Sequence, residues 1–258
     1  MRRALHAEWT KLATARGTAW LIFGIVAATA ALTAAVDATV RCTALGCDQD
    51  PTRLSLTGVQ LGQAVVAGLA ILAAGGEFGT GMIRTTLLAV PRRTTVLAAK
   101  ATVVAGLTAA AGTVAVLASL LVARLVLPTA GFTAAHGHPL PSLTAGGTVR
   151  AAGGAVLYLV LVALIALATA TLVRDSAVAT GAVLALLYVP PVAVFLVSDP
   201  DWQTWLWRFS PMDTGLAILS TTHLADLPLT GWAGLAVTAG WAVALLLPAA
   251  ALLAHRDP

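Results

Sequence analysis

Charged residues are scarce in this chain. Asp, Glu, Lys and Arg make up 10% of its 258 residues, while 59% are hydrophobic and the mean hydropathy is +0.89. A soluble domain has about 25% charged residues, and so few charges cannot cover a water-facing surface. The composition therefore excludes a soluble domain and predicts an integral membrane protein. The basic residues lie at the ends of apolar runs, so no nucleic-acid partner is expected although the pI is near 9.7.

The sequence also lacks the common catalytic motifs. It has no G-x-x-x-x-G-K-[ST] phosphate loop, no H-E-x-x-H helix and no G-x-S-x-G elbow. The middle of each predicted span carries no ionisable residue, which argues against a proton-coupled transporter or an intramembrane protease. We therefore expect no enzyme activity, catalytic residue, cofactor site or metal site in this chain. Energy for any active process would come from a partner.

Only two cysteines are present, Cys42 and Cys47, and both fall in the predicted first outer loop. A loop outside the membrane permits oxidation, so a disulfide between them is plausible. Two free thiols are the alternative. His136 and His138 lie in the second outer loop without a third ligand nearby, and a solvated loop is therefore favoured over a zinc site.

Six apolar runs are long enough for membrane-spanning helices, which need about 20 residues. Their continuous apolarity excludes the alternating pattern of a barrel, so the predicted class is all-α. We predict one transmembrane domain over residues 1–258, with spans at about 18–36, 56–76, 101–123, 151–173, 177–197 and 232–254.

The basic residues predict the orientation of the spans. With both termini in the cytoplasm, ten Lys and Arg residues lie inside and five outside. Because cytoplasmic loops carry an excess of Lys and Arg, this distribution favours an N-in, C-in, multi-pass topology. The connection between the second and third spans is then cytoplasmic.

The N-terminal residues 1–16 have an amphipathic pattern. Leu5, Trp9 and Leu12 recur at i, i+4 and i+7, and Glu8 and Lys11 are among the polar residues that surround this stripe. The pattern predicts a short helix at the inner membrane interface. The alternative is a basic segment that only sets the topology.

The segment 199–231, predicted to lie outside, contains Trp202, Trp205 and Trp207. Clustered Trp is typical of a membrane–water interface. We expect short helices that dip into the outer leaflet, with an ordinary loop as the alternative. Pro190 and Pro191 are expected to break the end of the preceding span.

The segment 77–100 reads EFGTGMIRTTLLAVPRRTTVLAAK. It contains one carboxylate, two glycines, a proline and four basic residues, which is more than a simple connection between spans needs. Two glycines permit a sharp turn after Glu77, Thr80 can cap a short helix, and Pro91 would end it. A re-entry loop whose arginines only set the topology is the alternative. The residues that we expect to dock on a partner are Glu77, Phe78, Gly79, Thr80, Gly81, Ile83, Arg84, Leu87, Pro91, Arg92 and Arg93.

This segment resembles the ABC-2 type transporter permeases, the membrane subunits of ATP-binding-cassette exporters. The matching positions are Glu77, Gly81, the Pro91-Arg92-Arg93 run and Lys100, while Met82 stands where many members have Thr. The amphipathic start, the six spans and the long outer segment also match, so the resemblance covers nearly the whole chain.

The resemblance implies a permease subunit in the plasma membrane of a prokaryote. The segment after the second span would be a coupling helix that rests on a separate ATP-binding subunit, and that subunit would bind ATP and Mg. A second permease copy, identical or related, would complete the substrate path within the lipid. The alternatives are a scaffold or sensor that recruits a cytoplasmic partner without transport, and, less favoured, a membrane-embedded enzyme acting on lipids.

Overall fold

A computed structural model describes residues 1–42, 49–79, 93–133 and 140–255 of the chain. Over these residues the chain forms helices and no strands. The helices are α1 (Arg2–Thr14), α2 (Arg16–Thr39), α3 (Pro51–Ser55), α4 (Val59–Gly79), α6 (Arg93–Val126), η1 (Leu127–Ala130), α7 (Gly146–Val173), α8 (Ser176–Leu196), α9 (Pro200–Phe209), α10 (Pro211–Leu216), η3 (Ala217–Leu219), η4 (Leu224–Asp226) and α11 (Gly231–His255).

Six helical segments are long and apolar enough to cross a membrane, as predicted. They cover Arg16–Thr39, Pro51–Gly76, Thr94–Ala130, Gly146–Val173, Ser176–Leu196 and Gly231–His255. The largest departure from the predicted bounds is α6, which begins at Arg93 and so includes Lys100. Its 34 residues extend about 51 Å at 1.5 Å per residue. Because the hydrocarbon core is only about 30 Å thick, the ends of α6 reach beyond it.

The expected break of the fifth span at Pro190 and Pro191 is wrong. Helix α8 continues through both prolines to Leu196. A proline removes one backbone hydrogen bond and strains the turn before it. Membrane helices nevertheless tolerate proline where neighbouring groups satisfy the freed carbonyl.

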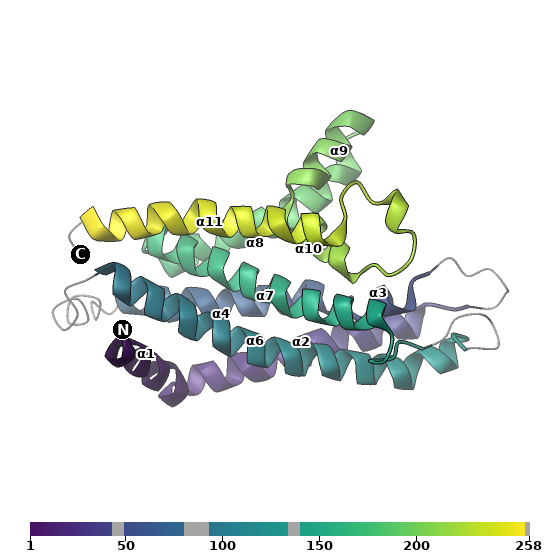
Figure 1. Ribbon diagram of the computed structural model, residues 1–258, viewed down its shortest axis with the longest axis horizontal. Helices are drawn as coiled ribbons and strands as arrows, with labels where there is room; N and C mark the ends of the chain where they lie inside the picture. The colour runs from purple at the N-terminus through teal and green to yellow at the C-terminus, as the bar shows by residue number, and fades with distance from the viewer. Residues whose placement is uncertain (43–48, 80–92, 134–139, 256–258) are drawn as a thin grey trace.

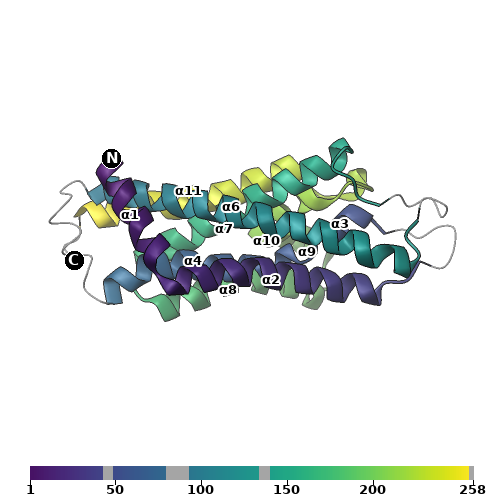
Figure 2. The same ribbon diagram turned by 90° about the horizontal axis from the view of Figure 1, so that it is seen from below.

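The long helices lie side by side along the long axis of the molecule (Figures 1 and 2). Helix α1 and the C-terminal end of α11 lie at the same end, which we call the terminal end, with the last turn of α4 and the first turn of α6 (Figure 1). Helix α3 and the connection from α10 to α11 lie at the opposite, far end. Termini at one end agree with an even number of crossings, while the N-in, C-in orientation stays a prediction.

Helix α7 is the centre of the bundle. It packs against α4, α6, α8 and α11, and Tyr158, Leu159 and Val162 on it are fully buried. Much of α7 is Ala and Gly. Small side chains let helix backbones approach closely, which is how membrane helices gain packing contacts without a hydrophobic driving force between them.

The segment from α10 to η3 is inserted into the bundle against α7 and α11. Met212, Leu216 and Ile218 on it belong to the main core. Glycines make room for this insertion. A Cβ atom added to Gly234 of α11 would lie 2.0 Å from the backbone oxygen of Thr214. The expected short helices are thus present between residues 199 and 231, and their depth in the membrane stays a prediction.

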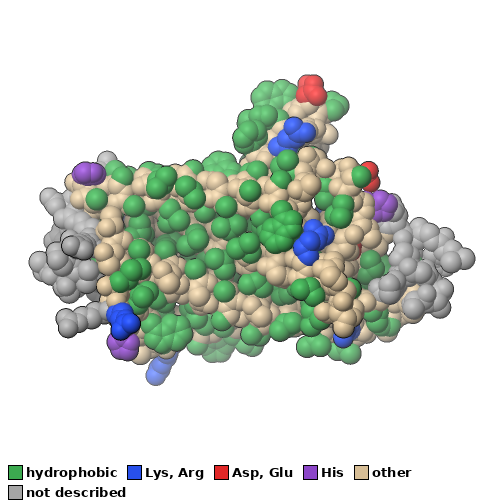
Figure 3. Space-filling model, viewed as in Figure 1, with side chains coloured by type: hydrophobic (Ala, Val, Ile, Leu, Met, Phe, Trp, Pro, Cys, Tyr) green, Lys and Arg blue, Asp and Glu red, His purple; other side chains and the backbone are tan. Residues whose placement is uncertain are grey.

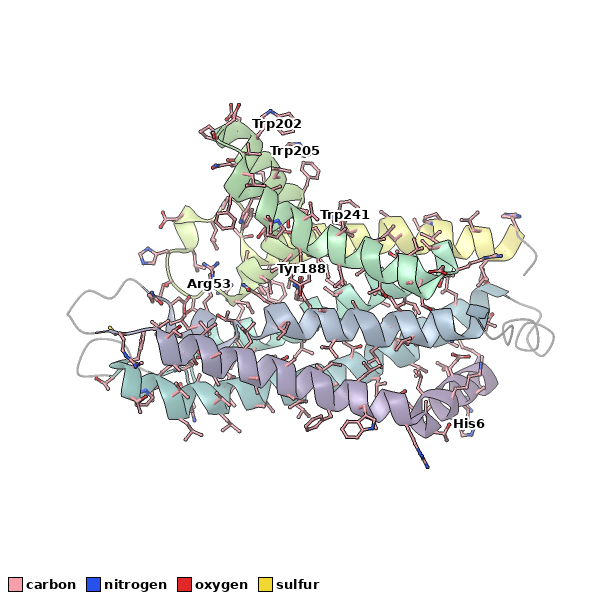
Figure 4. All side chains as sticks on the ribbon, turned by 180° about the vertical axis from the view of Figure 1, so that it is seen from behind. His6, Arg53, Tyr188, Trp202, Trp205 and Trp241 are labelled. Atoms are coloured by element: carbon pink, nitrogen blue, oxygen red, sulfur yellow. The ribbon has the colours of Figure 1, made fainter. Side chains whose placement is uncertain are left out.

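Helix α9 projects away from the bundle (Figure 1). None of its residues is buried. The rings of Trp202 and Trp205 meet edge to face at 5.5 Å, and Phe209 lies 4.9 Å from Trp205. Figure 4 shows both Trp side chains on this projecting helix. Exposed clusters of Trp side chains are typical of the membrane–water interface.

The outer surface of the bundle is apolar. Figure 3 shows hydrophobic side chains over the middle of one face, with most of the charged side chains near its ends and on α9. Large hydrophobic residues such as Trp20 of α2 and Phe195 of α8 are exposed, at 73% and 88%. Such a surface suits a hydrocarbon surrounding, and the fold is that of a multi-pass membrane protein.

Asp37 is an exception to the expected distribution of charge. The sequence places it just outside the first span, whereas α2 continues to Thr39 and buries Asp37 completely. Neither carboxylate oxygen has a hydrogen-bond partner among the described residues. A buried carboxylate without a partner is costly, and the structure offers no compensating contact for it within the described part of the chain.

Gly234 provides a test of the inserted segment. Gly234→Ala should lower the free energy of unfolding by about 1–3 kcal/mol, because the new methyl group collides with backbone that cannot move aside. Gly240→Ala is the matched control, since Gly240 lies in the same helix and a Cβ atom there meets nothing within 4 Å. Thermal unfolding of both purified variants in detergent would check this, and equal stability would contradict the packing described.

Candidate functional site

The predicted docking segment lies mostly outside the described residues. Glu77, Phe78 and Gly79 form the last turn of α4, and Arg93 begins α6. The other predicted docking positions are outside the described residues: Thr80, Gly81, Ile83, Arg84, Leu87, Pro91 and Arg92. What the structure does describe is the pair of helix ends that flank the segment, and the helix that packs on one of them.

Helix α1 is joined to those helix ends by a buried ion pair, which the sequence did not reveal. Lys100 Nζ of α6 donates to Glu8 Oε2 of α1 at 2.5 Å and to the backbone oxygen of Ala73 in α4 at 2.9 Å. Lys11 Nζ donates to the other oxygen, Glu8 Oε1, also at 2.9 Å. We call Glu8, Lys11, Lys100 and Ala73 the terminal junction. It connects three helices through one ammonium group.

The charged groups of the terminal junction are withdrawn from water. Side-chain exposure is 3% for Glu8 and 7% for Lys100. Burial by itself would raise the pKa of Glu8, but the charge and hydrogen bond of Lys100, together with those of Lys11, outweigh it and hold that pKa below its usual value. The carboxylate is therefore ionised at neutral pH. Such pairs are costly to break because the remaining charge stays buried.

The terminal junction fixes how α1 packs on the bundle, while its place at the inner membrane interface stays a prediction. The predicted apolar stripe was Leu5, Trp9 and Leu12, with Glu8 beside it. In the structure Trp9 is 52% exposed, whereas Ala4 and Glu8 are buried against the bundle. The face that carries Glu8 therefore packs on the bundle. Leu12 of the predicted stripe also packs against the core, whereas Trp9 points outward. The sequence contained two indications of this contact, the i, i+3 spacing of Glu8 and Lys11 and a single lysine, Lys100, beside an apolar run. It could not show that Glu8 and Lys100 meet, because they lie 92 residues apart.

Other polar groups connect helices deeper in the bundle. The Tyr158 hydroxyl of α7 donates to Gln63 Oε1 of α4, and Gln63 Nε2 contacts Met212 Sδ at 3.2 Å. The Tyr188 hydroxyl of α8 donates to the backbone oxygen of Gln60 at 2.5 Å. These contacts join α4 to α7, α8 and α10, which is the usual role of polar side chains between membrane helices.

The sequence candidates at the far end are only partly described. Cys42 is buried beside Leu127 and Phe132. Cys47, His136 and His138 lie outside the described residues. The disulfide therefore stays a prediction. No cluster of three potential metal ligands occurs among the residues that the structure describes.

Comparison with known proteins adds no family assignment. No protein-family model matches the chain. No curated protein matches it either. The assignment to the class of multi-pass membrane proteins rests on the six long apolar helices.

The terminal junction predicts a non-additive pattern of stability. Glu8→Gln or Lys100→Met alone should lower the free energy of unfolding by about 3 kcal/mol, because each removes one charge of the buried pair. The remaining charge then keeps only its second partner, the Ala73 oxygen for Lys100 or Lys11 for Glu8. The double variant should be more stable than the Lys100→Met variant. Thermal unfolding in detergent of both single variants and the double variant measures the coupling. Losses that simply add would show that the two groups do not interact.

The pKa of Glu8 predicts an acid-sensitive contact between α1 and the bundle. Because its folded pKa is lowered from 4.5, the contribution is fully present above about pH 4.5 and is lost as the pH falls through the lower folded value. The stability advantage of the natural chain over Glu8→Gln should hold constant between about pH 7 and pH 5 and shrink below. Melting temperatures of both proteins measured from about pH 7 to below about pH 4.5 would check this. A stability advantage of the natural chain that grows on acidification would contradict the lowered pKa of Glu8.

Proposed function

We propose that this chain is the permease subunit of an ATP-driven exporter of the ABC-2 type. In this proposal the terminal end faces the cytoplasm of a prokaryote, and a separate subunit binds ATP and Mg there. The observation that carries the proposal is the terminal junction, because it ties α1 to the two helices on either side of residues 80–92. Together with the predicted docking residues, it would make one mechanical unit of the N-terminal helix and both spans.

The terminal junction has the properties that transmission of force needs. Lys100 bonds to α1 and α4 at once, so α1, α4 and α6 resist separation at this end. Helices α4 and α6 each pack along α7. A push on the segment between α4 and α6 would therefore shift both helices against the centre of the bundle. Rigid-body movement of this kind is one way to alternate the access of a cavity.

The proposal includes a second copy of this chain or a related permease. Helices α2, α8 and α11 present large exposed apolar residues, among them Phe23, Val192 and Leu247. These faces suit lipid or another membrane subunit equally. Two copies would enclose the substrate path between them, with energy supplied by the ATP-binding subunit.

Charge reversal tests the docking proposal directly. The double variant Arg92→Glu, Arg93→Glu should co-purify less of a co-expressed ATP-binding-cassette subunit, because the negative charges would repel partner carboxylates. Glu77→Ala is made separately and should reduce coupling. We expect a fall of about tenfold or more in substrate-stimulated ATP hydrolysis by reconstituted complexes for the double variant, which corresponds to about 1.4 kcal/mol.

The matched control is Arg208→Glu, which reverses an exposed arginine on α9, away from the terminal end. It should leave co-purification and hydrolysis unchanged. Normal coupling in all variants would refute the docking role. Co-purification that depends on Arg92 and Arg93 without any substrate-stimulated hydrolysis would favour a non-transporting scaffold or sensor instead.

A further inference from the structure

The far end of the bundle contains a cleft of about 560 Å³ that the proposed function does not use. One wall comes from α3 and its flanks and includes Arg53 and Thr57. The other comes from the segment between η3 and α11 and includes Ser220, Thr222 and Asp226. Figure 4 shows Arg53 at this end, beside the segment that leads into α11.

The two walls are held together by the carboxylate of Asp50. Asp50 caps α3 by accepting from the backbone N–H groups of Thr52 and Arg53 at 3.0 and 3.2 Å. It also accepts from the Thr221 backbone, from Thr221 Oγ1 at 2.8 Å and from the Thr222 backbone at 3.0 Å. Burial would raise the pKa of Asp50, but these hydrogen bonds outweigh it and lower that pKa. The Asp50 oxygens are thus occupied by donors within the protein, although the carboxylate keeps its negative charge.

Two groups in the cleft are left with unused hydrogen-bonding capacity. The guanidinium of Arg53 is exposed and has no side-chain acceptor within the described part of the chain. Ser220 is only 3% exposed, yet its hydroxyl has no hydrogen-bond partner among the same residues. Buried hydroxyl groups are nearly always paired. Thr108 and Ser119 also have buried hydroxyl groups without a partner among the described residues, but only Ser220 lines this cleft together with an exposed guanidinium. That combination suits a polar ligand.

The surroundings favour an oxyanion. Arg150 Nη2 donates to the backbone oxygen of Ser220 at 2.6 Å, which places a second guanidinium next to this wall. Asp226, the remaining carboxylate in the cleft, lies 3.4 Å from His223 Nδ1. His223 has the left-handed backbone φ of 52°, a conformation that side-chain-bearing residues adopt at some cost and that recurs at ligand sites. Arginine binds phosphate groups through two parallel hydrogen bonds.

We propose that this cleft binds the phosphate group of a small polar solute or of a lipid headgroup, with Arg53 as the charged anchor and the Ser220 hydroxyl as a buried donor. The hydroxyl groups of Thr57 and Thr222 line the same space and suit the polyol part of such a ligand. Since both walls contact the ligand, its binding holds α3 against the segment before α11. The inference does not rest on the proposed transport function.

The test measures binding to the full chain in two arms. In detergent, glycerol 3-phosphate is titrated and binding is followed by isothermal calorimetry. In nanodiscs, retention of phosphatidylglycerol is followed by native mass spectrometry. Arg53→Gln should weaken binding about tenfold or more in at least one arm, because a charge-assisted bidentate contact is lost. An effect in the first arm identifies a free solute, and one in the second alone identifies a lipid headgroup.

Ser220→Ala gives a signature that a structural role would not produce. It removes an unpaired buried hydroxyl, so the unliganded protein should be as stable as the natural chain or more so, while ligand affinity falls. Arg208→Gln is the control, since it removes an exposed arginine outside the cleft. Binding unaffected by Arg53→Gln and Ser220→Ala in both arms, or weakened equally by Arg208→Gln, would overturn the proposal.

Discussion

A polar group that is taken out of water must find a partner inside the protein, and this constraint shapes the whole molecule. Hydrocarbon cannot bond to backbone N–H and C=O groups, so the apolar runs fold as helices that satisfy their own backbone. The same constraint acts on side chains. Lys100 is buried, with apolar neighbours along α6. Its ammonium is accommodated because Glu8 and Ala73 accept from it.

Polar contacts therefore occur at a few places where they join elements that are distant in sequence. The terminal junction joins α1, α4 and α6, Gln63 and Tyr158 join α4 to α7, and Asp50 joins α3 to the segment before α11. Single hydrogen bonds such as that of Thr238 to the Pro211 oxygen add to these contacts. Elsewhere among the described residues the helices touch mainly through Ala, Val and Leu, whose contacts have little directionality. The polar contacts thus fix the relative positions of helices that apolar packing alone would leave free to slide.

The two proposals concern opposite ends of the bundle and rest on opposite observations. At the terminal end Glu8, Lys11 and Lys100 are paired with one another, and this pairing suggests that α1 and the flanking helices move together. At the far end the hydroxyl of Ser220 is buried without a partner, and the deficiency suggests a ligand. Asp37, Thr108, Ser119 and Asp213 also carry buried polar atoms without a partner among the described residues, but none of them lines the cleft at the far end.

The sequence by itself determined the helical class and the six helices that are long and apolar enough to cross a membrane, because both follow from hydropathy along continuous runs. It did not determine which polar residues meet. Glu8 was assigned to the polar side of α1, and only the tertiary structure paired it with Lys100, 92 positions away. The sequence likewise did not predict the cleft at the far end, because Arg53 and Ser220 come from segments far apart in the chain. Local periodicity specifies the faces of a helix, whereas pairing between helices depends on how they pack.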